Sequence, residues 1–403
     1  MRLGPEGIVV LFSSTAVLSS GAACRGSSQA PVADAGAPAA DADPNGDTSV
    51  GTDAAPGDAG ADASSFPPPF AIDALARARI GSANSTGWPN VGKASADFDW
   101  KQGPFAVVKL VVDLDTTCYP FETWAANPPP SGQNVPADCD AFDRNFNAFI
   151  DGGAGAGAGS SGPFEIMHAI TPFGGPEHLE IDLTDLANAL PGAHRLRVDL
   201  TSYSDTAGQS TGSNNGWTVS ARFQVTPGDA PRRVLAAIPL YAGQIETGDA
   251  GPVVPFDAPD GTVSGRLEYR TSGHGQGEMA TGCIGPAEEF CDRHQTIVID
   301  GAPALDIHPW RYDCASLCTL QHHDAFGPFV NGLDYCRENP LGLPSSVRAS
   351  RANWCPGSMT QPYSWPDIPA LAVPGPHTFS FQVSEILAGG TWMASAIYYA
   401  YGS

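Results

Sequence analysis

With 403 residues, of which 46 are glycine and 37 are proline, and with only 16% charged residues, the chain has the composition of a loop-rich β protein. Its formal net charge of −23 at pH 7 argues against nucleic acid and anionic lipid surfaces as partners, because like charges repel. No stretch of basic residues offsets this charge. We therefore expect no nucleic-acid partner.

The first 24 residues are typical of a bacterial lipoprotein export signal. Arg2 provides a positive charge, residues 8–18 are largely apolar, and small residues lead to Cys24. The apolar part is too short for a stable membrane span, which favours a cleaved signal. We expect an exported protein, either a cell-surface or periplasmic lipoprotein or a secreted one. A lipid anchor at Cys24 would be its only contact with a membrane.

Residues 25–66 form an acidic stretch of Ala, Asp, Gly, Pro and Ser. They contain few large apolar side chains, so burial cannot offset their ordering entropy and we expect a disordered linker. The cysteines agree with export. Nine are present, and with Cys24 set aside the other eight (9 − 1) can pair fully in an oxidising compartment.

Two β-rich domains are predicted beyond the linker, at residues 67–228 and 229–403, with a joint near 226–231. Alternating apolar and polar residues, which place one set of side chains on one face, predict the strands at 217–225 and 378–383, whereas 105–115 is predicted from its apolar run and 295–300 as a more buried strand. The predicted strands are 105–115, 217–225, 234–241, 295–300 and 378–383. A short helix is predicted within 181–190, beginning at Thr184. Such strands are typical of sandwiches and jelly rolls.

The segment 139–144, Cys-Asp-Ala-Phe-Asp-Arg, follows the first of these strands and places a carboxylate, Asp143, beside Arg144. If Cys139 pairs with Cys118, the disulfide closes a long excursion and fixes Asp143 at the end of a sheet. A fixed carboxylate suits a general base, because the effect of such a base depends on its position. The alternative is that Asp143 and Arg144 form an ordinary ion pair at the end of a loop.

Further motifs follow in order along the chain. Besides 139–144 they are 165–173, 179–186 with Leu-Glu-Ile-Asp, 271–275, 289–291, 336–340 and 351–357 with Arg-Ala-Asn-Trp-Cys-Pro-Gly. Together these motifs resemble the peptide-N-glycosidase F family over about residues 70–403. The resemblance implies an all-β fold of two consecutive eight-stranded antiparallel jelly rolls, packed side by side.

The resemblance also implies a disulfide pattern. It pairs Cys118 with Cys139, Cys283 with Cys291 and Cys336 with Cys355, and leaves Cys314 and Cys318 to form a local pair. A zinc site made by those last two cysteines with His322 and His323 is the alternative. The expected oxidising compartment favours the disulfide.

Members of the family hydrolyse the amide that joins an N-linked glycan to asparagine, giving a glycosylamine and an aspartate. By resemblance Asp143 is the principal catalytic residue, and Glu289 is a second carboxylate that acts through water. Arg351 and Arg144 match the family's arginines near the reacting amide. The two carboxylates lie in different predicted domains, which places the site at the domain interface. Amide hydrolysis of this kind requires no cofactor or metal. The expected partner is an N-linked glycoprotein or glycopeptide, and we expect a monomer.

The sequence departs from the family at the expected substrate site. Thr201 stands where the family has a third glutamate, and Tyr203 replaces a tryptophan, although its ring could still stack on a sugar. Asp199 would share the strand face of position 201 and could substitute only from a displaced position, and Asp205 lies nearby. His274 replaces another tryptophan. The substrate pocket therefore differs from that of the family.

Two other functions stay open. The fold could have kept a glycan site without turnover, as a surface glycan-binding protein, and Thr201 favours this reading. A copper-dependent monooxygenase of related double jelly-roll form would need His-x-His clusters, and the chain has only one adjacent pair of histidines. Glu289 could also be an exposed loop acid, and Arg351 could brace a carboxylate structurally. We expect His168 and the other scattered histidines to be ordinary surface or core residues.

Overall fold

The structure, a computed structural model, describes residues 66–151, 162–275, 281–327, 329–366 and 368–403. These residues belong to one compact unit. The predicted signal, Cys24 and nearly all of the predicted linker lie outside the described residues. Within the described ranges, no helix is long and apolar enough to cross a membrane.

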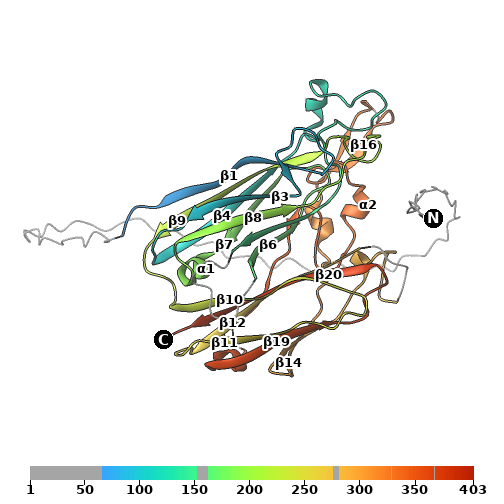
Figure 1. The fold of residues 1–403 in the computed structure, drawn as a ribbon. Helices are drawn as coiled ribbons and strands as arrows, with labels where there is room; N and C mark the ends of the chain where they lie inside the picture. Colours follow the sequence, from blue (N-terminus) through green and yellow to red (C-terminus); the bar gives the residue numbers. More distant parts are fainter. Residues whose placement is uncertain (1–65, 152–161, 276–280, 328, 367) are drawn as a thin grey trace, which may run out of the picture. The chain divides into compact units, whose positions relative to one another are not determined.

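Ten strands form the first sandwich, a pair of sheets that are antiparallel except where the short β2 pairs in parallel with β1 (Figure 1). Its strands are β1 (Phe70–Gly81), β2 (Asn90–Val91), β3 (Lys93–Asp99), β4 (Phe105–Asp115), β5 (Asn145–Ile150), β6 (Phe164–Ile170), β7 (Glu177–Asp182), β8 (Ala193–Leu200), β9 (Gly216–Pro227) and β17 (Ser358–Met359). One sheet has the order β2-β1-β9-β4-β7 and the other the order β17-β6-β5-β8-β3. The pairing is nested, with β1 on β9, β3 on β8, β4 on β7 and β5 on β6. This nesting is that of an eight-stranded jelly roll.

The second half of the chain repeats this plan. Its strands are β10 (Val234–Glu246), β11 (Val253–Ala258), β12 (Ser264–Gly275), β13 (Gln295–Ile299), β14 (Ala302–Ile307), β18 (Tyr363–Trp365), β19 (Gly375–Val383) and β20 (Gly390–Tyr401). Their sheets have the orders β10-β20-β12-β18 and β11-β19-β13-β14. The pairing is again nested, from β10 on β20 inward to β13 on β14. The predicted all-β fold of two jelly rolls is confirmed.

The remaining elements are short. They are the hairpin β15 (Leu320–His323) and β16 (Leu333–Cys336), the helices α1 (Thr184–Ala189) and α2 (Pro344–Val347), and the 3-10 turns η1 (Phe121–Ala125), η2 (Glu288–Phe290), η3 (Cys314–Leu317) and η4 (Pro369–Ala372). The predicted strand at 105–115 coincides with β4, and α1 begins at Thr184 as predicted.

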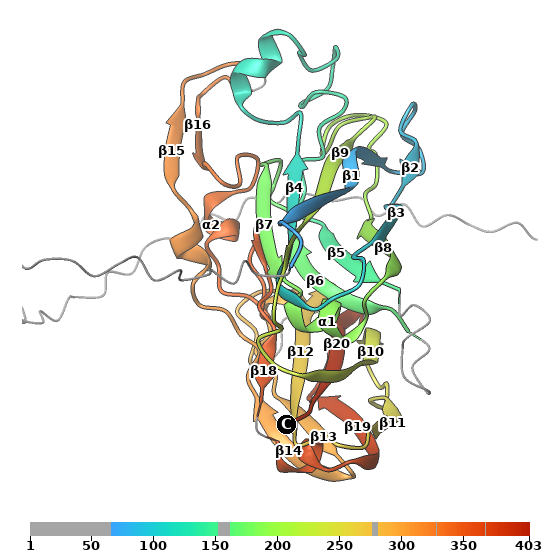
Figure 2. The same cartoon turned by 90° about the vertical axis from the view of Figure 1, so that its left-hand side faces the viewer.

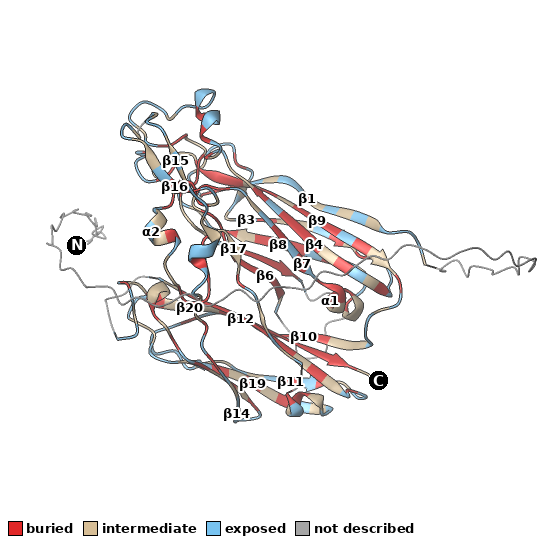
Figure 3. Ribbon diagram, turned by 180° about the vertical axis from the view of Figure 1, so that it is seen from behind, coloured by how far each residue is buried: buried red, intermediate tan, exposed pale blue. Residues whose placement is uncertain are grey.

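Alternation along the strands builds the cores of the sandwiches. On β9 the side chains of Trp217, Val219, Ala221, Phe223 and Val225 are at most 1% exposed, while the residues between them face away from the core. Figure 3 shows the resulting stripes of buried and exposed residues along β9 and β4. Full burial stabilises a side chain the size of valine or phenylalanine by about 1.5–3 kcal/mol, so this face determines the register of the strand.

The two sandwiches pack directly against each other. Ala237 of β10, with Tyr399 and Tyr401 of β20, joins the hydrophobic core of the first sandwich. Arg266 of β12 donates a hydrogen bond to Asp185 of α1 at 3.0 Å, and the Tyr401 hydroxyl donates another to the same carboxylate at 2.7 Å. The strand β17 comes from the second half of the chain and pairs with β6 of the first sandwich.

Four disulfides are present among the described residues. Cys118–Cys139 and Cys283–Cys291 form as predicted. The other two predicted pairs are wrong, because the structure joins Cys314 to Cys355 and Cys318 to Cys336. The alternative zinc site is also wrong, since both of its cysteines are consumed in these disulfides.

The tertiary structure explains the exchange of partners. In the β15–β16 hairpin Leu320 lies opposite Cys336, which leaves Cys318 at the open end of the hairpin with its Cα 4.9 Å from that of Cys336. A bridge between Arg311 and Arg351 aligns the two segments that carry Cys314 and Cys355. Strand contacts, and neither the resemblance nor closeness in sequence, therefore decided which of these four sulfur atoms meet.

Candidate active site

The loop that carries Asp143 is held in place by a disulfide and an aromatic cluster. The chain leaves β4, makes the excursion that contains η1, and is closed by the Cys118–Cys139 disulfide. Aromatic side chains from the excursion and from β16 pack around this disulfide: Phe121, Trp124 and Tyr335. Figure 2 shows η1 beside the β15–β16 hairpin. Asp143 is two residues before β5, so the backbone on both sides of it is fixed.

Arg144 pairs with Asp140 rather than with Asp143. Its guanidinium donates from Nε and Nη2 to the fully buried Asp140 carboxylate at 2.8–3.2 Å, and the Ser202 hydroxyl donates to the same carboxylate at 2.5 Å. The guanidinium also lies 4.6 Å from the ring centre of Tyr203. The interpretation of Asp143 and Arg144 as a simple loop-end ion pair is therefore wrong, and the Asp143 carboxylate is left available for other contacts.

Two adjacent glutamates in η2 have different roles. Glu288 is fully buried, accepts hydrogen bonds from Arg293 and from the indole of Trp392, and thus belongs to the framework. Glu289 keeps 27% of its side chain exposed and accepts a hydrogen bond from Arg351 Nη1 at 2.8 Å. The Cys283–Cys291 disulfide encloses η2 and holds both carboxylates in place.

Arg351 is a cation held on several sides while only 1% exposed. Its Nη2 donates to the carbonyl and hydroxyl oxygens of Ser346 at 2.9 and 3.0 Å. Its guanidinium lies 4.7 Å from the ring centre of Phe290 and 4.4 Å from that of Trp354. A buried guanidinium with this many partners has one position, which is what electrostatic stabilisation of a reacting group requires.

Glu289 and Arg351 act electrostatically on Asp143 although they are far from it in sequence. Burial raises the pKa of the Asp143 carboxyl to about 7. The positive charge of Arg351 opposes this rise, the negative charge of Glu289 adds to it, and Arg144 also opposes it. The first sandwich supplies the aspartate, and the second supplies Glu289 and Arg351, whose charges act on it.

His274, at the end of β12, lies on the edge of this group. Its ring stacks on Trp354 at a centroid distance of 5.3 Å, and its Nε2 lies 2.6 Å from Ser272 Oγ. Burial lowers the pKa of His274 to about 3, and the charges of His168 and Arg351 add to this effect. The imidazole is therefore neutral at physiological pH. His168, which the sequence predicts to be an ordinary surface or core residue, is fully buried with its Nε2 2.5 Å from Ser272 Oγ, whereas Ser272 was not singled out from the sequence.

Comparison with known proteins supports the family resemblance. Residues 244–401 match the family model "Peptide-N-glycosidase F, C terminal". No curated protein sequence matches the chain. The solved structure of recombinant peptide:N-glycanase F (PNGase F) is 17% identical, covers 83% of this chain and 96% of its own, and superposes with a TM-score of 0.58.

Two further solved structures agree. PNGase F from Flavobacterium meningosepticum, described as a glycosylasparaginase, is 18% identical over 83% of this chain and 96% of its own, with a TM-score of 0.58. PNGF-II is 18% identical over 83% of this chain and 66% of its own, with a TM-score of 0.55. Residues 244–401 thus resemble the C-terminal part of peptide-N-glycosidase F, and the described chain resembles its structures in fold. The likeness to these structures establishes its double jelly-roll fold.

The protein departs from the pattern of the peptide-N-glycosidase F family where the sequence indicates. Thr201 lies exposed directly after β8, and Tyr203 is 51% exposed with its ring stacked on Phe142. Asp199 forms an ion pair with Arg197 at 3.0 Å. Asp205 accepts backbone hydrogen bonds from the turn at 207–210, which lower its pKa. Both aspartates are thus engaged in local structure.

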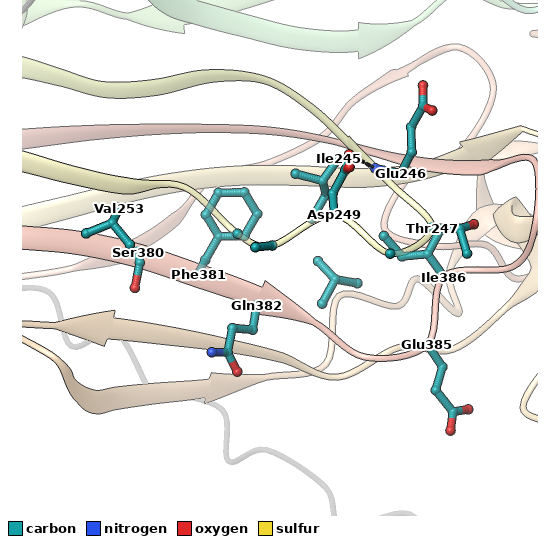
Figure 4. A pocket seen from close by; sticks show the side chains of 14 residues that line it. Ile245, Glu246, Thr247, Asp249, Val253, Ser380, Phe381, Gln382, Glu385 and Ile386 are labelled. Atoms are coloured by element: carbon teal, nitrogen blue, oxygen red, sulfur yellow. Dashed lines mark hydrogen bonds between the residues drawn. The ribbon is translucent and has the colours of Figure 1, made fainter.

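One cavity of the protein is a separate feature. It measures about 650 Å³ and lies where the β10–β11 connection meets the end of β19. Figure 4 shows Ile245, Phe381 and Ile386 on its wall, with Glu246 and Glu385 also around it. None of its lining residues belongs to the group around Asp143. This cavity is therefore not the candidate active site.

Proposed function

We propose that the protein is an amidase that hydrolyses the amide bond between an N-linked glycan and asparagine in glycoproteins or glycopeptides. The observation that carries this proposal is the electrostatic action of Glu289 and Arg351 from one sandwich on Asp143 from the other, in a PNGase F-like fold. A half-buried carboxylate with a raised pKa beside a fixed cation is the combination that general base catalysis of amide hydrolysis needs.

In the proposed reaction Asp143 removes a proton from a water molecule as the water oxygen attacks the amide carbonyl carbon. Negative charge develops on the carbonyl oxygen, and Arg351 stabilises it. The C–N bond then breaks, and the proton held by Asp143 passes to the leaving nitrogen. The products are a glycosylamine and an aspartate, and Asp143 returns to its ionised form.

The pKa of about 7 for Asp143 suits both halves of this cycle. A group that titrates near the working pH can accept a proton and release it again without a large energetic cost in either direction. Glu289 is held by Arg351 at 2.8 Å and would orient the water molecule while its ionised carboxylate keeps the pKa of Asp143 high. We assign Glu289 the role of second carboxylate.

The setting of the reaction is also part of the proposal. Four disulfides among the described residues favour an oxidising compartment, so we propose export of the protein. A lipid anchor at Cys24, the disordered linker, domain limits at 67–228 and 229–403 and a monomeric state are proposed from the sequence. Arg144 and Tyr203 are proposed to contact the sugar next to the reacting amide.

A non-catalytic glycan-binding protein is the second candidate. Thr201 supplies no carboxylate where the family has a glutamate, so one acidic group of the family site is missing. The exposed ring of Tyr203, supported by Phe142 and Arg144, is a suitable platform for a sugar face. This candidate predicts glycan binding with no release, whereas the amidase requires release.

Glycan release from a denatured N-glycoprotein separates the candidates. The full-length chain is compared with Asp143→Asn and with Asp97→Asn, a matched control whose carboxylate pairs with Arg195 on the protein surface. We expect release by the parent and the control but none by Asp143→Asn. In heavy-oxygen water the new aspartate must carry the label. Binding of a glycopeptide without any release by the parent would refute the amidase and favour the second candidate.

A further inference from the structure

Two histidines lie opposite each other at the open end of the β13–β14 hairpin. Gln295 of β13 pairs with Ile307 of β14, and His294 and His308 are each one residue further toward that end. The sheet that contains both strands lies on the side of the second sandwich away from the first (Figure 1). The two Nε2 atoms are 2.5 Å apart, and the rings are nearly perpendicular, at 85°. Two ring nitrogens this close need a proton or a metal ion between them, since each would otherwise present a lone pair to the other.

Each imidazole has a carboxylate beside its other ring nitrogen. Asp292 Oδ1 lies 3.4 Å from His308 Nδ1, and Asp306 Oδ2 lies 4.0 Å from His294 Nδ1. The Asp292 Oδ1 atom is buried and makes no hydrogen bond within the described part of the chain, so it is available to the imidazole. Among the ion pairs of the described residues, neither aspartate has a lysine or arginine partner. A carboxylate behind the ring is typical of metal-ligating histidines, because it orients the imidazole and makes the ligating nitrogen more basic.

The backbone of both histidines is held while their rings stay mobile. The His294 N–H donates to Ser384 Oγ at 3.1 Å, and its carbonyl accepts from the Ser384 N–H at 2.9 Å. The His308 carbonyl accepts from the Trp310 N–H at 2.9 Å and from the Tyr363 hydroxyl at 3.2 Å. The two imidazole side chains, by contrast, are 59% and 50% exposed.

This freedom matters for the fit of a metal ion. Zinc lies about 2.0–2.1 Å from a histidine nitrogen, so tetrahedral geometry places two such nitrogens about 3.3 Å apart. The Nε2 atoms of His294 and His308 must therefore separate by about 0.8 Å, which a small rotation of two half-exposed rings provides.

We propose that His294 and His308 bind one divalent transition-metal ion of the class that prefers imidazole, Zn²⁺ or Cu²⁺, through their Nε2 atoms. Asp292 and Asp306 orient the two rings. No set of three His, Cys, Asp or Glu side chains is arranged around one metal position in the described ranges, so water completes the coordination. The ion joins β13 to β14 at the end opposite their turn, and it stabilises the folded chain because the unfolded chain does not hold the pair together. This site is independent of the proposed amidase.

Metal titration of the full-length protein, first stripped with a chelator, tests the site. Calorimetry with Cu²⁺, Zn²⁺ and Ca²⁺ gives the affinities. We expect one site per chain that depends on this pair of histidines, with Cu²⁺ bound more tightly than Zn²⁺. Ca²⁺ should not bind there, because it prefers oxygen ligands. The electron paramagnetic resonance spectrum of the Cu²⁺ form should show two imidazole nitrogens, and only one in each single histidine variant.

The variants separate ligands from orienting residues. His294→Gln and His308→Gln should each weaken binding more than Asp292→Asn, for which we expect a loss of about 10-fold, as for an outer partner of a metal ligand. His178→Gln is the matched control, because His178 is also exposed and lies 2.6 Å from a carboxylate, that of Asp113, but has no facing histidine. Its affinity for both ions should equal that of the parent.

Thermal unfolding gives a second readout. Excess Zn²⁺ should raise the melting temperature of the parent and of His178→Gln, but not that of His308→Gln. Absence of Zn²⁺ and Cu²⁺ binding in the parent would overturn the proposal, and so would equal affinities in the parent and both histidine variants. In either case a shared proton alone joins the two nitrogens.

Discussion

The interior of the first sandwich and the layer between the two sandwiches are both buried, but they are built from different residues. The interior is filled by side chains such as Phe223 and Trp217, with a cross-sheet contact of 4.3 Å between the ring centres of Phe98 and Phe223. The layer between the sandwiches contains charged and polar groups, among them Glu165 and Arg266. Burial by itself therefore does not distinguish framework from function in this protein.

The difference has a physical cause. An apolar interior is non-directional, so it tolerates small shifts and specifies mainly the fold. Buried polar groups are costly unless each finds a partner, so a polar layer fixes side-chain positions much more narrowly. Chemistry needs that narrow positioning, and Glu289 and Arg351 of one sandwich act electrostatically on Asp143 of the other. The comparison predicts that interior substitutions reduce stability, while substitutions near the junction change activity and its pH dependence.

Phe223→Ala should have the largest effect on stability. The side chain is fully buried between the sheets of the first sandwich, and its removal leaves a cavity that the sheets cannot close. We expect a loss of about 3–5 kcal/mol in the free energy of unfolding, measured by urea denaturation. Val107→Ala, at a 40% exposed position on the neighbouring β4, is the control and should cost much less. Equal losses would mean that the interior is not the source of stability.

Arg351→Met should have the largest effect on activity. It removes the cation beside Asp143 and leaves the Glu289 carboxylate without its hydrogen-bond partner. We expect kcat/KM for glycan release to fall about 100- to 1,000-fold, as for the loss of one electrostatic donor to a reacting oxygen. Arg348→Met alters an exposed arginine three residues away and should be nearly neutral. If kcat stays unchanged and kcat/KM falls only because KM rises, Arg351 contributes to substrate binding alone.

Asp143→Asn should abolish release and yet stabilise the protein at alkaline pH. The folded pKa of about 7 lies above the usual value of 3.8 for aspartate, so the folded state holds the extra proton and the free energy of unfolding falls as pH rises through that window. Asparagine does not titrate, so the substitution removes this loss of stability with rising pH. We expect the variant to exceed the parent by about 2–4 kcal/mol at pH 8 and by little near pH 4, from urea unfolding.

The pH dependence of the parent's activity tests the same pKa of Asp143. Because the general base must be ionised, kcat/KM should rise with pH and level off above an inflection near 7. An inflection near pH 4 would contradict the assignment of Asp143 as the base, since an ordinary exposed aspartate titrates there.

Glu177→Gln tests a buried carboxyl that lies away from the junction, and its effect should be smaller. Burial raises the pKa of Glu177 to about 8, and neither carboxyl oxygen has a partner among the described residues. The free energy of unfolding therefore falls as pH rises from about 4.5 to 8. The neutral amide should remove about 1–3 kcal/mol of that fall. The effect is limited because the ionised side chain can turn toward solvent at high pH. Activity should not change. Melting temperatures at pH 6 and pH 9 give the comparison.

The sequence by itself determined the elements of the fold. An apolar run predicted β4 to the residue, and alternation predicted the buried face of β9, because both patterns are local properties of an extended chain. The start of α1 at Thr184 was also predicted from local signals. The motif that contains Asp143 was recognised from the sequence as well, although only the resemblance connected it with Glu289 and Arg351.

The tertiary structure determined which side chains pair with one another. It joined Cys314 to Cys355 and Cys318 to Cys336, paired Arg144 with Asp140, and assigned Glu288 to the framework while Glu289 contacts Arg351. It also aligned His168 with Ser272 across the junction. Pairs of this kind depend on contacts between residues distant in sequence, and local periodicity carries no information about which of several equivalent side chains will meet. The sequence therefore fixes which strands form, and the packing of the two sandwiches decides which polar groups can act together.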